Sequence, residues 1–185
     1  GDGLSQAYNY RICLTDSLEN MIPITKPENY DPSHYELLIR LMEAQPDKTE
    51  LTDYFIWSPM PCRKTDVNNK GGFSTDMIGA NHNYPEGTYE ERQAIIQAHK
   101  DYTIGLLYFV GHDERVPAPI REEMLRWGFP KDEYVETGHW SPQLYIRECR
   151  RMVGEYVATQ KDCEQKTHVE DWVGMAAYTM DSHNC

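Results

Sequence analysis

The chain has 185 residues, of which 39% are hydrophobic and 26% charged, as expected for a folded domain rather than a disordered segment. Its 18 basic and 30 acidic side chains give a net charge of −12. This balance argues against binding to nucleic acid or to an anionic membrane surface, because both need a clustered basic face. The longest apolar run, residues 104–110, is much shorter than the roughly 20 residues of a membrane span.

The N-terminal part of the chain predicts a strand followed by a helix. Alternation over residues 6–15 is typical of a strand with one buried face. The side chains expected on that face are Tyr8, Tyr10, Ile12 and Leu14. After a connection over residues 15–29, Asp31 and Pro32 have the residue types that begin a helix. The apolar stripe of this helix is Leu37, Leu38, Leu41 and Met42.

The middle of the chain is less regular. Residues 51–57 are expected to form a short strand. Residues 58–87 have no sustained period and are rich in Asn, Asp, Gly and Pro, which indicates a long loop, either functional or disordered. Short strands within it are expected near residues 63–67 and 73–78.

The second half is expected to start with two helices. A capping box at Thr88 predicts a helix over residues 88–110, and a second helix is expected over residues 118–127. Residues 160–171 are polar and should form a connection. The pattern of residues 172–183 is again strand-like.

Positive charge gathers in "GHWSPQLYIRECRR", residues 138–151, which otherwise resembles core sequence. The segment fits either a helix or a strand, and Arg147 and Arg151 would share one side in both. An arginine fork suits a carboxylate or a flavin-like acceptor edge, although these arginines could also pair with the surplus of Asp and Glu. Trp140, just ahead, would form either a stacking wall or a buried anchor.

Other candidate residues are polar side chains near a turn or at the end of a strand. His183 could act as an acid or base oriented by Asp181, because a carboxylate fixes the imidazole tautomer; the alternative is a hydrogen-bonded histidine at a strand end. Residues in the long loop that suit a sugar or polyol, but also ordinary turns, are Lys64, Asp66, Asn68, Asn69, Asn81 and His82.

Several common site patterns are missing from the sequence. The five cysteines form no CxxC pair, and the seven histidines include no HExxH, so neither a disulfide framework nor a metal site is expected. The cysteine pattern is compatible with either redox compartment. There is also no GxSxG, Walker or GxGxxG sequence, so this chain alone is not expected to hold a dinucleotide in the usual way.

Several stretches together resemble the FAD-dependent oxidoreductase family, found largely in bacteria, some members of which carry a xanthan lyase label. They are "QAYNYRICLT", "KPENYDPSHYELL", "KTDVNNKGGFSTDMIGAN", "VPAPIREEMLRWG", "DEYVETGHWSPQLYIRECRRMVGEYVATQKDC" and "GMAAYTMDSHN". The resemblance covers nearly the whole chain, and its most specific parts are the long arginine-containing string and "DSHN".

The resemblance implies that residues 1–185 are one domain, internal to a larger protein. Full-length relatives have a Rossmann-type FAD-binding half with GxGxxG, and this chain matches the substrate-side domain that covers the flavin. The implied fold is α+β, with a mixed, largely antiparallel sheet and covering helices. The implied partner is the missing FAD-binding domain. FAD is expected in the parent protein, whereas the isolated chain should be inactive and bind FAD weakly or not at all.

The implied activity is hydride transfer to FAD from a small polar or carbohydrate-like substrate. Candidate residues for proton transfer, chosen by side-chain type, are His139, His183 and Asp181. Candidates for substrate binding are Arg147, Arg151, Trp140, Lys64, Asn68 and Asn69. Two other classes stay open: a polysaccharide lyase acting on uronate-containing glycans, and a non-catalytic carbohydrate-binding or interaction module.

Overall fold

One antiparallel sheet organises the fold of the computed structural model, which describes residues 4–179 and 181–185. Within these residues, five strands follow the spatial order β2-β5-β1-β4-β3, and each pairing is antiparallel. The strands are β1 (Ile12–Thr15), β2 (Met21–Pro23), β3 (Phe55–Met60), β4 (Lys64–Asn69) and β5 (Gly128–Pro130). The predicted α+β class is confirmed, and in the described part the sheet is antiparallel rather than mixed.

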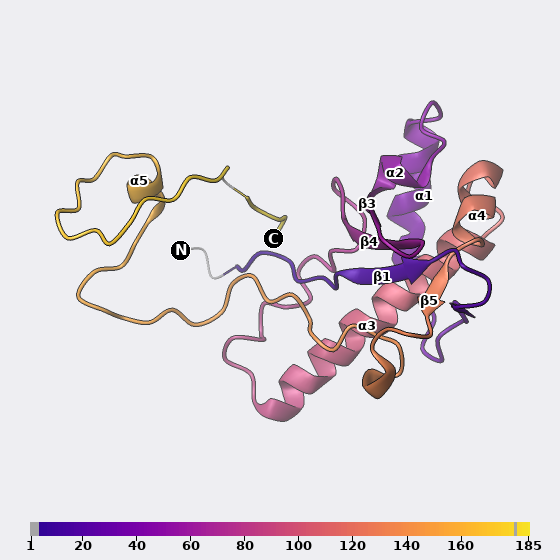
Figure 1. Ribbon diagram of the computed structural model, residues 1–185, viewed down its shortest axis with the longest axis horizontal. Helices are drawn as coiled ribbons and strands as arrows, with labels where there is room; N and C mark the ends of the chain where they lie inside the picture. Colours follow the sequence, from indigo (N-terminus) through magenta and orange to yellow (C-terminus); the bar gives the residue numbers. More distant parts are fainter. Residues whose placement is uncertain (1–3, 180) are drawn as a thin grey trace.

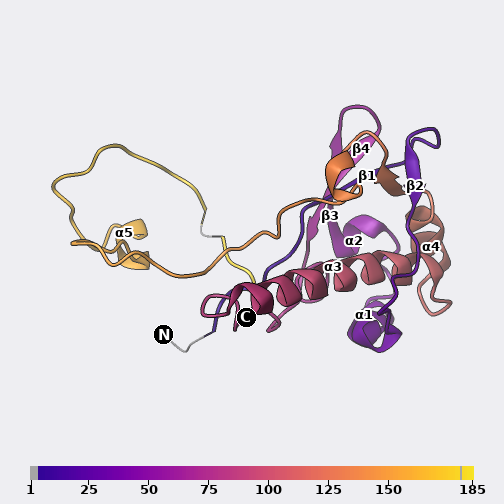
Figure 2. The same ribbon diagram turned by 90° about the horizontal axis from the view of Figure 1, so that it is seen from below.

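The main helices lie on one side of this sheet (Figure 1, Figure 2). The helical elements are η1 (Pro32–Tyr35), α1 (Glu36–Ala44), α2 (Leu51–Tyr54), α3 (Tyr89–His112), α4 (Ala118–Met124), η2 (Val135–Thr137) and α5 (Gln160–Cys163). The capping box predicted at the start of α3 is confirmed. Thr88 Oγ1 accepts from the backbone N–H of Glu91 at 3.2 Å, and Glu91 Oε2 accepts from that of Thr88 at 2.7 Å.

The predicted strand over residues 6–15 is confirmed only in its second half. The four side chains expected on its inner face, Tyr8, Tyr10, Ile12 and Leu14, are all buried. However, the ladder with β4 begins at Ile12. Before it, the backbone pairs with Tyr145 through an isolated bridge at Asn9. The Asn9 side chain, which the alternation left to solvent, is fully buried and binds Asn68, Thr75 and Arg147.

Two helix-related expectations need correction at their boundaries. The carboxylate of Asp31 accepts from the Ser33 N–H at 2.9 Å, but it caps the 3₁₀ turn η1, so the α-helix starts only at Glu36. Residues 51–57 are not one strand, because α2 occupies their first half. The Asp53 carboxylate accepts from the Glu50 N–H at 3.0 Å, which stabilises a helical turn before β3 begins.

Three further segments differ in part from their sequence patterns. The short strand expected near residues 63–67 is confirmed within β4, whereas residues 73–78 form no strand. Residues 138–151 are neither helix nor strand apart from the bridge at Tyr145. The strand predicted over residues 172–183 is wrong for its described residues, which are mostly exposed; residue 180 lies outside the description.

Residues 150–179 extend away from the sheet and helices and then return to them (Figure 1). The short α5 lies within this excursion, and most of its side chains are exposed. At the return, the backbone N–H of Ala7 donates to the carbonyl of Asn184 at 2.8 Å. The end of the described chain therefore lies beside the extended segment that precedes β1. No helix in the described residues is long and apolar enough to cross a membrane.

The packing of α3 against η1 predicts a strong effect of Gly105→Ala. A methyl group here would overlap the Tyr35 hydroxyl, which is buried and donates to the Tyr102 carbonyl at 2.9 Å. We expect the variant to lose about 1–2 kcal/mol of stability, since overpacking outweighs the gain in helix propensity. The matched control is Gly111→Ala in the same helix, where the new methyl group meets the half-exposed Leu125 at 3.3 Å and Met124 at 3.6 Å without overlapping either. Urea unfolding checks the pair, and equal midpoints would contradict the predicted clash.

Ionisation of buried tyrosines should reduce the stability of the fold at alkaline pH. Burial, with smaller contributions from Cys149 and Tyr84, raises the pKa of Tyr8 from 10.0 to about 12. Because the folded value exceeds the unfolded one, this contribution to stability is complete below about pH 10 and is lost as the pH rises through about 12. Burial also raises the pKa of Tyr35 and of Tyr102.

We therefore expect the urea midpoint of the wild type to fall between about pH 9 and pH 12, and Tyr8→Phe to reduce this slope. The variant also loses the hydrogen bond that the Tyr8 hydroxyl donates to the carbonyl of Glu148. It should therefore be less stable at neutral pH by about 0.5–1.5 kcal/mol. Identical alkaline slopes for the two proteins would show that the Tyr8 hydroxyl does not titrate with unfolding.

Candidate functional site

A polar, open cleft of about 750 Å³ lies where the excursion returns to the sheet. Its walls come from separate parts of the chain: Arg11, Ile56, residues 68–72, Tyr145, Arg147, residues 178–179 and residues 181–184. Five residues singled out from the sequence are among them, namely Asn68, Asn69, Arg147, Asp181 and His183. The fold therefore brings together candidates from the long loop, the arginine segment and the "DSHN" string.

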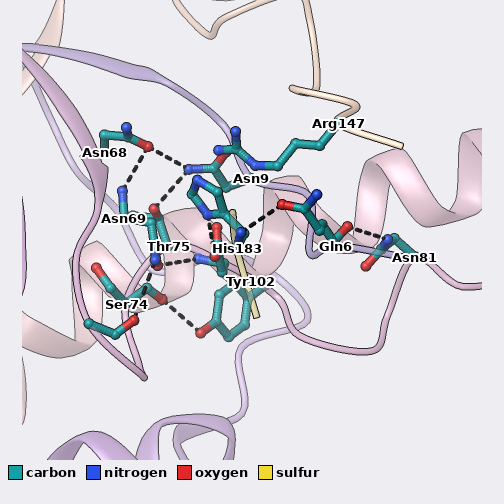
Figure 3. A network of polar contacts seen from close by, with 12 residues as sticks. Gln6, Asn9, Asn68, Asn69, Ser74, Thr75, Asn81, Tyr102, Arg147 and His183 are labelled. Atoms are coloured by element: carbon teal, nitrogen blue, oxygen red, sulfur yellow. Dashed lines mark hydrogen bonds and ion pairs between the residues drawn. The ribbon is translucent and has the colours of Figure 1, made fainter. Parts of the chain in front are cut away.

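Buried Asn9 connects two walls of the cleft (Figure 3). Its amide nitrogen donates to Asn68 Oδ1 at 2.8 Å and to Thr75 Oγ1 at 3.2 Å. Its amide oxygen accepts from Arg147 Nη2 at 2.9 Å. With both ends of the amide engaged, Asn9 sets the position of Asn68 relative to Arg147. The sequence pattern missed this role, because it placed Asn9 on the outer face of the first strand.

His183 is oriented by Asp76, which corrects the expected pairing with Asp181. The two side chains meet at 2.6 Å between Nδ1 and Oδ2, and the Asp76 side chain is almost fully buried. Burial raises the pKa of Asp76, although its interactions with His183 and Arg147 oppose this shift. Asp181 is exposed and lines the cleft. With Nδ1 turned toward Asp76, Nε2 is the nitrogen that remains for acid–base chemistry.

Backbone contacts hold His183 and Asp76 in place. The N–H of His183 donates to Gln6 Oε1 at 2.7 Å, beside the bond between Ala7 and Asn184. The N–H of Asp76 donates to Asn69 Oδ1 at 3.0 Å. The pair therefore connects the returning segment to the loop after β4, and its geometry depends on the fold around it.

Arg147 presents its guanidinium to the cleft from the arginine segment. Its Cζ atom lies 4.3 Å from the ring centroid of Tyr145, and Nη2 donates to the amide oxygen of Asn9. Burial lowers the pKa of Arg147, while Asp76 and Asp181 oppose the shift. The Nε atom is buried without a hydrogen-bond partner in the described residues.

The other candidates lie outside the walls of the cleft. Lys64 is nearly buried and forms ion pairs with Asp132 at 2.8 Å and with Glu133 at 2.5 Å. Desolvation opposes its charged form, but these two hydrogen bonds outweigh it and raise its pKa. His139 contacts the Glu133 carbonyl through Nδ1 at 3.1 Å. Both side chains thus interact with the turn after β5.

Trp140 is a buried anchor, with 5% of its surface exposed, and the alternative of a stacking wall does not apply. Its ring packs edge-on against Tyr10 at 5.0 Å and Phe129 at 5.6 Å between centroids. Arg151 is exposed and pairs with Glu148 at 3.4 Å. Because the segment is irregular, the spacing of four does not place Arg151 beside Arg147, and only Arg147 lines the cleft.

The described residues contain no group of three or more His, Cys, Asp or Glu side chains that could hold a metal ion. The features above define an α+β domain with a polar, histidine-containing cleft at the edge of an antiparallel sheet. The sequence profile of the family described as FAD dependent oxidoreductase matches residues 1–185, so the chain belongs to that family. No curated protein and no solved structure shows significant similarity to it.

The residues of this chain do not fit the nucleotide part of FAD. A dinucleotide is usually held where parallel strands meet a glycine-rich turn and a helix N-terminus. In the described residues the strands pair only antiparallel, and the sequence has no GxGxxG. The described residues therefore offer no site of this kind for the nucleotide part of FAD.

Proposed function

We propose that the chain is the substrate-side domain of an FAD-dependent oxidoreductase and that its cleft orients a polar, carbohydrate-like alcohol for hydride transfer. The observation that carries the proposal is the position of the pair His183–Asp76 in the same cleft as Asn68, Asn69 and Arg147. A proton acceptor and several hydrogen-bond donors around one space are what oxidation of a hydroxyl group requires.

The role assigned to His183 is to accept the hydroxyl proton. Oxidation of an alcohol to a carbonyl removes a hydride from carbon and a proton from oxygen, and FAD bound in the parent protein supplies the hydride acceptor. His183 would take the proton at Nε2, since Nδ1 faces Asp76 at 2.6 Å. The Asp76 carboxylate would stabilise the imidazolium that results.

Asn68 and Asn69 are assigned the role of binding the hydroxyl groups of the substrate. The amide oxygen of Asn68 accepts from Asn9 at 2.8 Å and from the Asn69 N–H at 2.8 Å, and that of Asn69 accepts from Asp76. The orientation of both side-chain amides is thus set by hydrogen bonds to their oxygen atoms. The NH₂ group of Asn68 has no partner in the described residues, and that of Asn69 makes only a 3.5 Å contact with Gly71. These donors are suited to sugar hydroxyls.

The proposed partner is a separate FAD-binding domain in the same protein. The family membership supports it, together with the lack of a nucleotide site in the described residues. An open cleft also fits a domain that covers a flavin held by its neighbour. In this arrangement the chain contributes substrate binding and the proton acceptor, and the neighbouring domain contributes the flavin.

The test is anaerobic mixing of the FAD-loaded parent protein with a panel of sugars, polyols and sugar acids, followed at the flavin absorbance bands. We expect at least one member of the panel to bleach the flavin. Cleavage of a uronate polymer by flavin-free protein would instead support the lyase alternative. Saturable binding of the panel without any bleaching would support a non-catalytic module, and either result would overturn the proposal.

A further inference from the structure

The charge of the cleft is opposite to that of the chain. Among the described residues that line it, Arg11, Lys70 and Arg147 are cationic and Asp181 is anionic, whereas the whole chain has a net charge of −12. Arg11 is neutralised by an ion pair with Asp66. Such a local reversal concentrates anions at the cleft and repels them from the rest of the surface.

Arg147 and Lys70 have no ion pair among the described residues. Lys70 donates to the backbone carbonyl of Thr52, which leaves its charge uncompensated. Arg147 donates to the neutral amide of Asn9 through Nη2. Its Nε is buried without a partner, and its Nη1 has no acceptor in the described part of the chain. A guanidinium that is half-buried, positioned and incompletely bonded is a good receptor for a carboxylate.

The proton chemistry proposed for His183 adds to this argument. Asp76 contacts His183 at 2.6 Å, and its charge, like that of Asp181, counteracts the lowering of the Arg147 pKa by burial. With a neutral imidazole, the single negative charge of Asp76 balances Arg147. Once His183 has accepted a proton, these three side chains carry one excess positive charge, and the other charged groups of the described walls do not cancel it, because Asp181 is matched by Lys70 and Arg11 by Asp66. An anionic group on the substrate would offset that charge.

We infer that the substrate of this cleft carries a carboxylate, held by Arg147, next to the hydroxyl group that is oxidised, so that its class is a sugar acid or another hydroxy acid. The inference rests on the proposed function and narrows its substrate from polar molecules in general to anionic ones. Arg147 then anchors the carboxylate through the edge that Asn9 leaves open, while Asn68 and Asn69 contact the hydroxyl groups.

The test compares acids with neutral partners of nearly the same shape. The ¹⁵N-labelled full chain is titrated with galacturonate and its methyl ester, and with glycolate and glycolamide, and Kd is obtained from chemical-shift changes. We expect the acid of at least one pair to bind about 10-fold or more tightly than its neutral partner, as one charged hydrogen bond provides. The preference should decrease with added salt, because the attraction is partly exposed.

Arg147→Met should abolish the preference, so that acid and neutral partner bind with equal affinity. The matched control is Arg150→Met, which removes an exposed arginine that pairs with Glu86 at 3.2 Å outside the cleft. It should retain the preference. If Arg147→Met does not fold, the comparison of acid and ester in the wild type still decides the question.

The possible outcomes distinguish the inference of an anionic substrate from the proposed function on which it rests. Equal binding of acids and neutral partners by the wild type would overturn the inference that the substrate carries a carboxylate. The proposal of a polar substrate would be unaffected. A preference that survives in Arg147→Met would overturn the assignment to Arg147. If no member of either pair causes shifts at the cleft residues, the inference fails, and the proposed substrate cleft fails with it.

Discussion

Replacing His183 with glutamine is expected to slow substrate-driven flavin reduction in the parent protein by about 10²–10⁴-fold, the usual contribution of a general base. Glutamine preserves a hydrogen-bonding side chain of similar length but cannot accept the proton at the position of Nε2. The Nδ1 contact with Asp76, at 2.6 Å, orients the imidazole, and His183 is the one histidine among the described residues that line the cleft, so no second imidazole can replace it. Stopped-flow absorbance of the flavin under anaerobic conditions measures the effect.

Two further variants make this result specific. His139→Gln alters the other histidine suggested by the sequence, which contacts the Glu133 carbonyl outside the cleft walls, and it should leave the rate nearly unchanged. Asp76→Asn tests a positioning residue and should lower kcat more than it raises KM, because substrate contacts remain. A normal rate in His183→Gln, or a large loss confined to His139→Gln, would contradict the proton-transfer assignment.

Replacing Phe109 with alanine is expected to reduce the free energy of unfolding by about 3–5 kcal/mol. Phe109 is fully buried on α3, and its ring lies 5.1 Å from that of Tyr35. Removing it opens a cavity at the contact between α3 and η1, beneath the sheet. Because domains of this size are stable by only about 5–15 kcal/mol, a loss of this size should be obvious in urea or thermal unfolding.

The matched control for Phe109→Ala is Tyr89→Ala, which removes an aromatic ring from the same helix at a position that is 83% exposed. A surface change of this kind should stay within about 0.5 kcal/mol of the wild type. A small effect at Phe109, or similar effects at both positions, would show that the contact between α3 and η1 is not a main source of stability.

The sequence predicted those parts of the fold that depend on local patterns. The capping box at Thr88 located the start of α3, and the alternation before Leu14 identified the inner face of the central strand. The sequence-based prediction failed where contacts between residues far apart in the sequence determine the local structure. The Asn9 side chain, expected on the outer face, is buried because it binds Asn68, Thr75 and Arg147, which are distant in sequence. The arginine segment is irregular, and its bonds to the N-terminal segment, such as that from Arg147 to Asn9, could not be read from its own pattern.

The site was predictable to a similar extent. Residue type pointed to His183, Arg147, Asn68 and Asn69, and the fold places them around one cleft. Asp76 was missed because it lies 107 residues from its partner His183 in the sequence, so no short motif joins them. Nearby Asp181 had the right chemistry at the right spacing. Which of two carboxylates reaches the imidazole is a property of the tertiary structure.

The order in which the chain leaves the ribosome has a consequence for the cleft. All five strands described are complete once Pro130 has been synthesised, so the sheet and its helices can form early. The wall that carries His183 is added last, when residues 181–184 return to Gln6 and Ala7. A nascent domain can therefore fold its sheet and most of its core before His183, the proposed proton acceptor, has been synthesised.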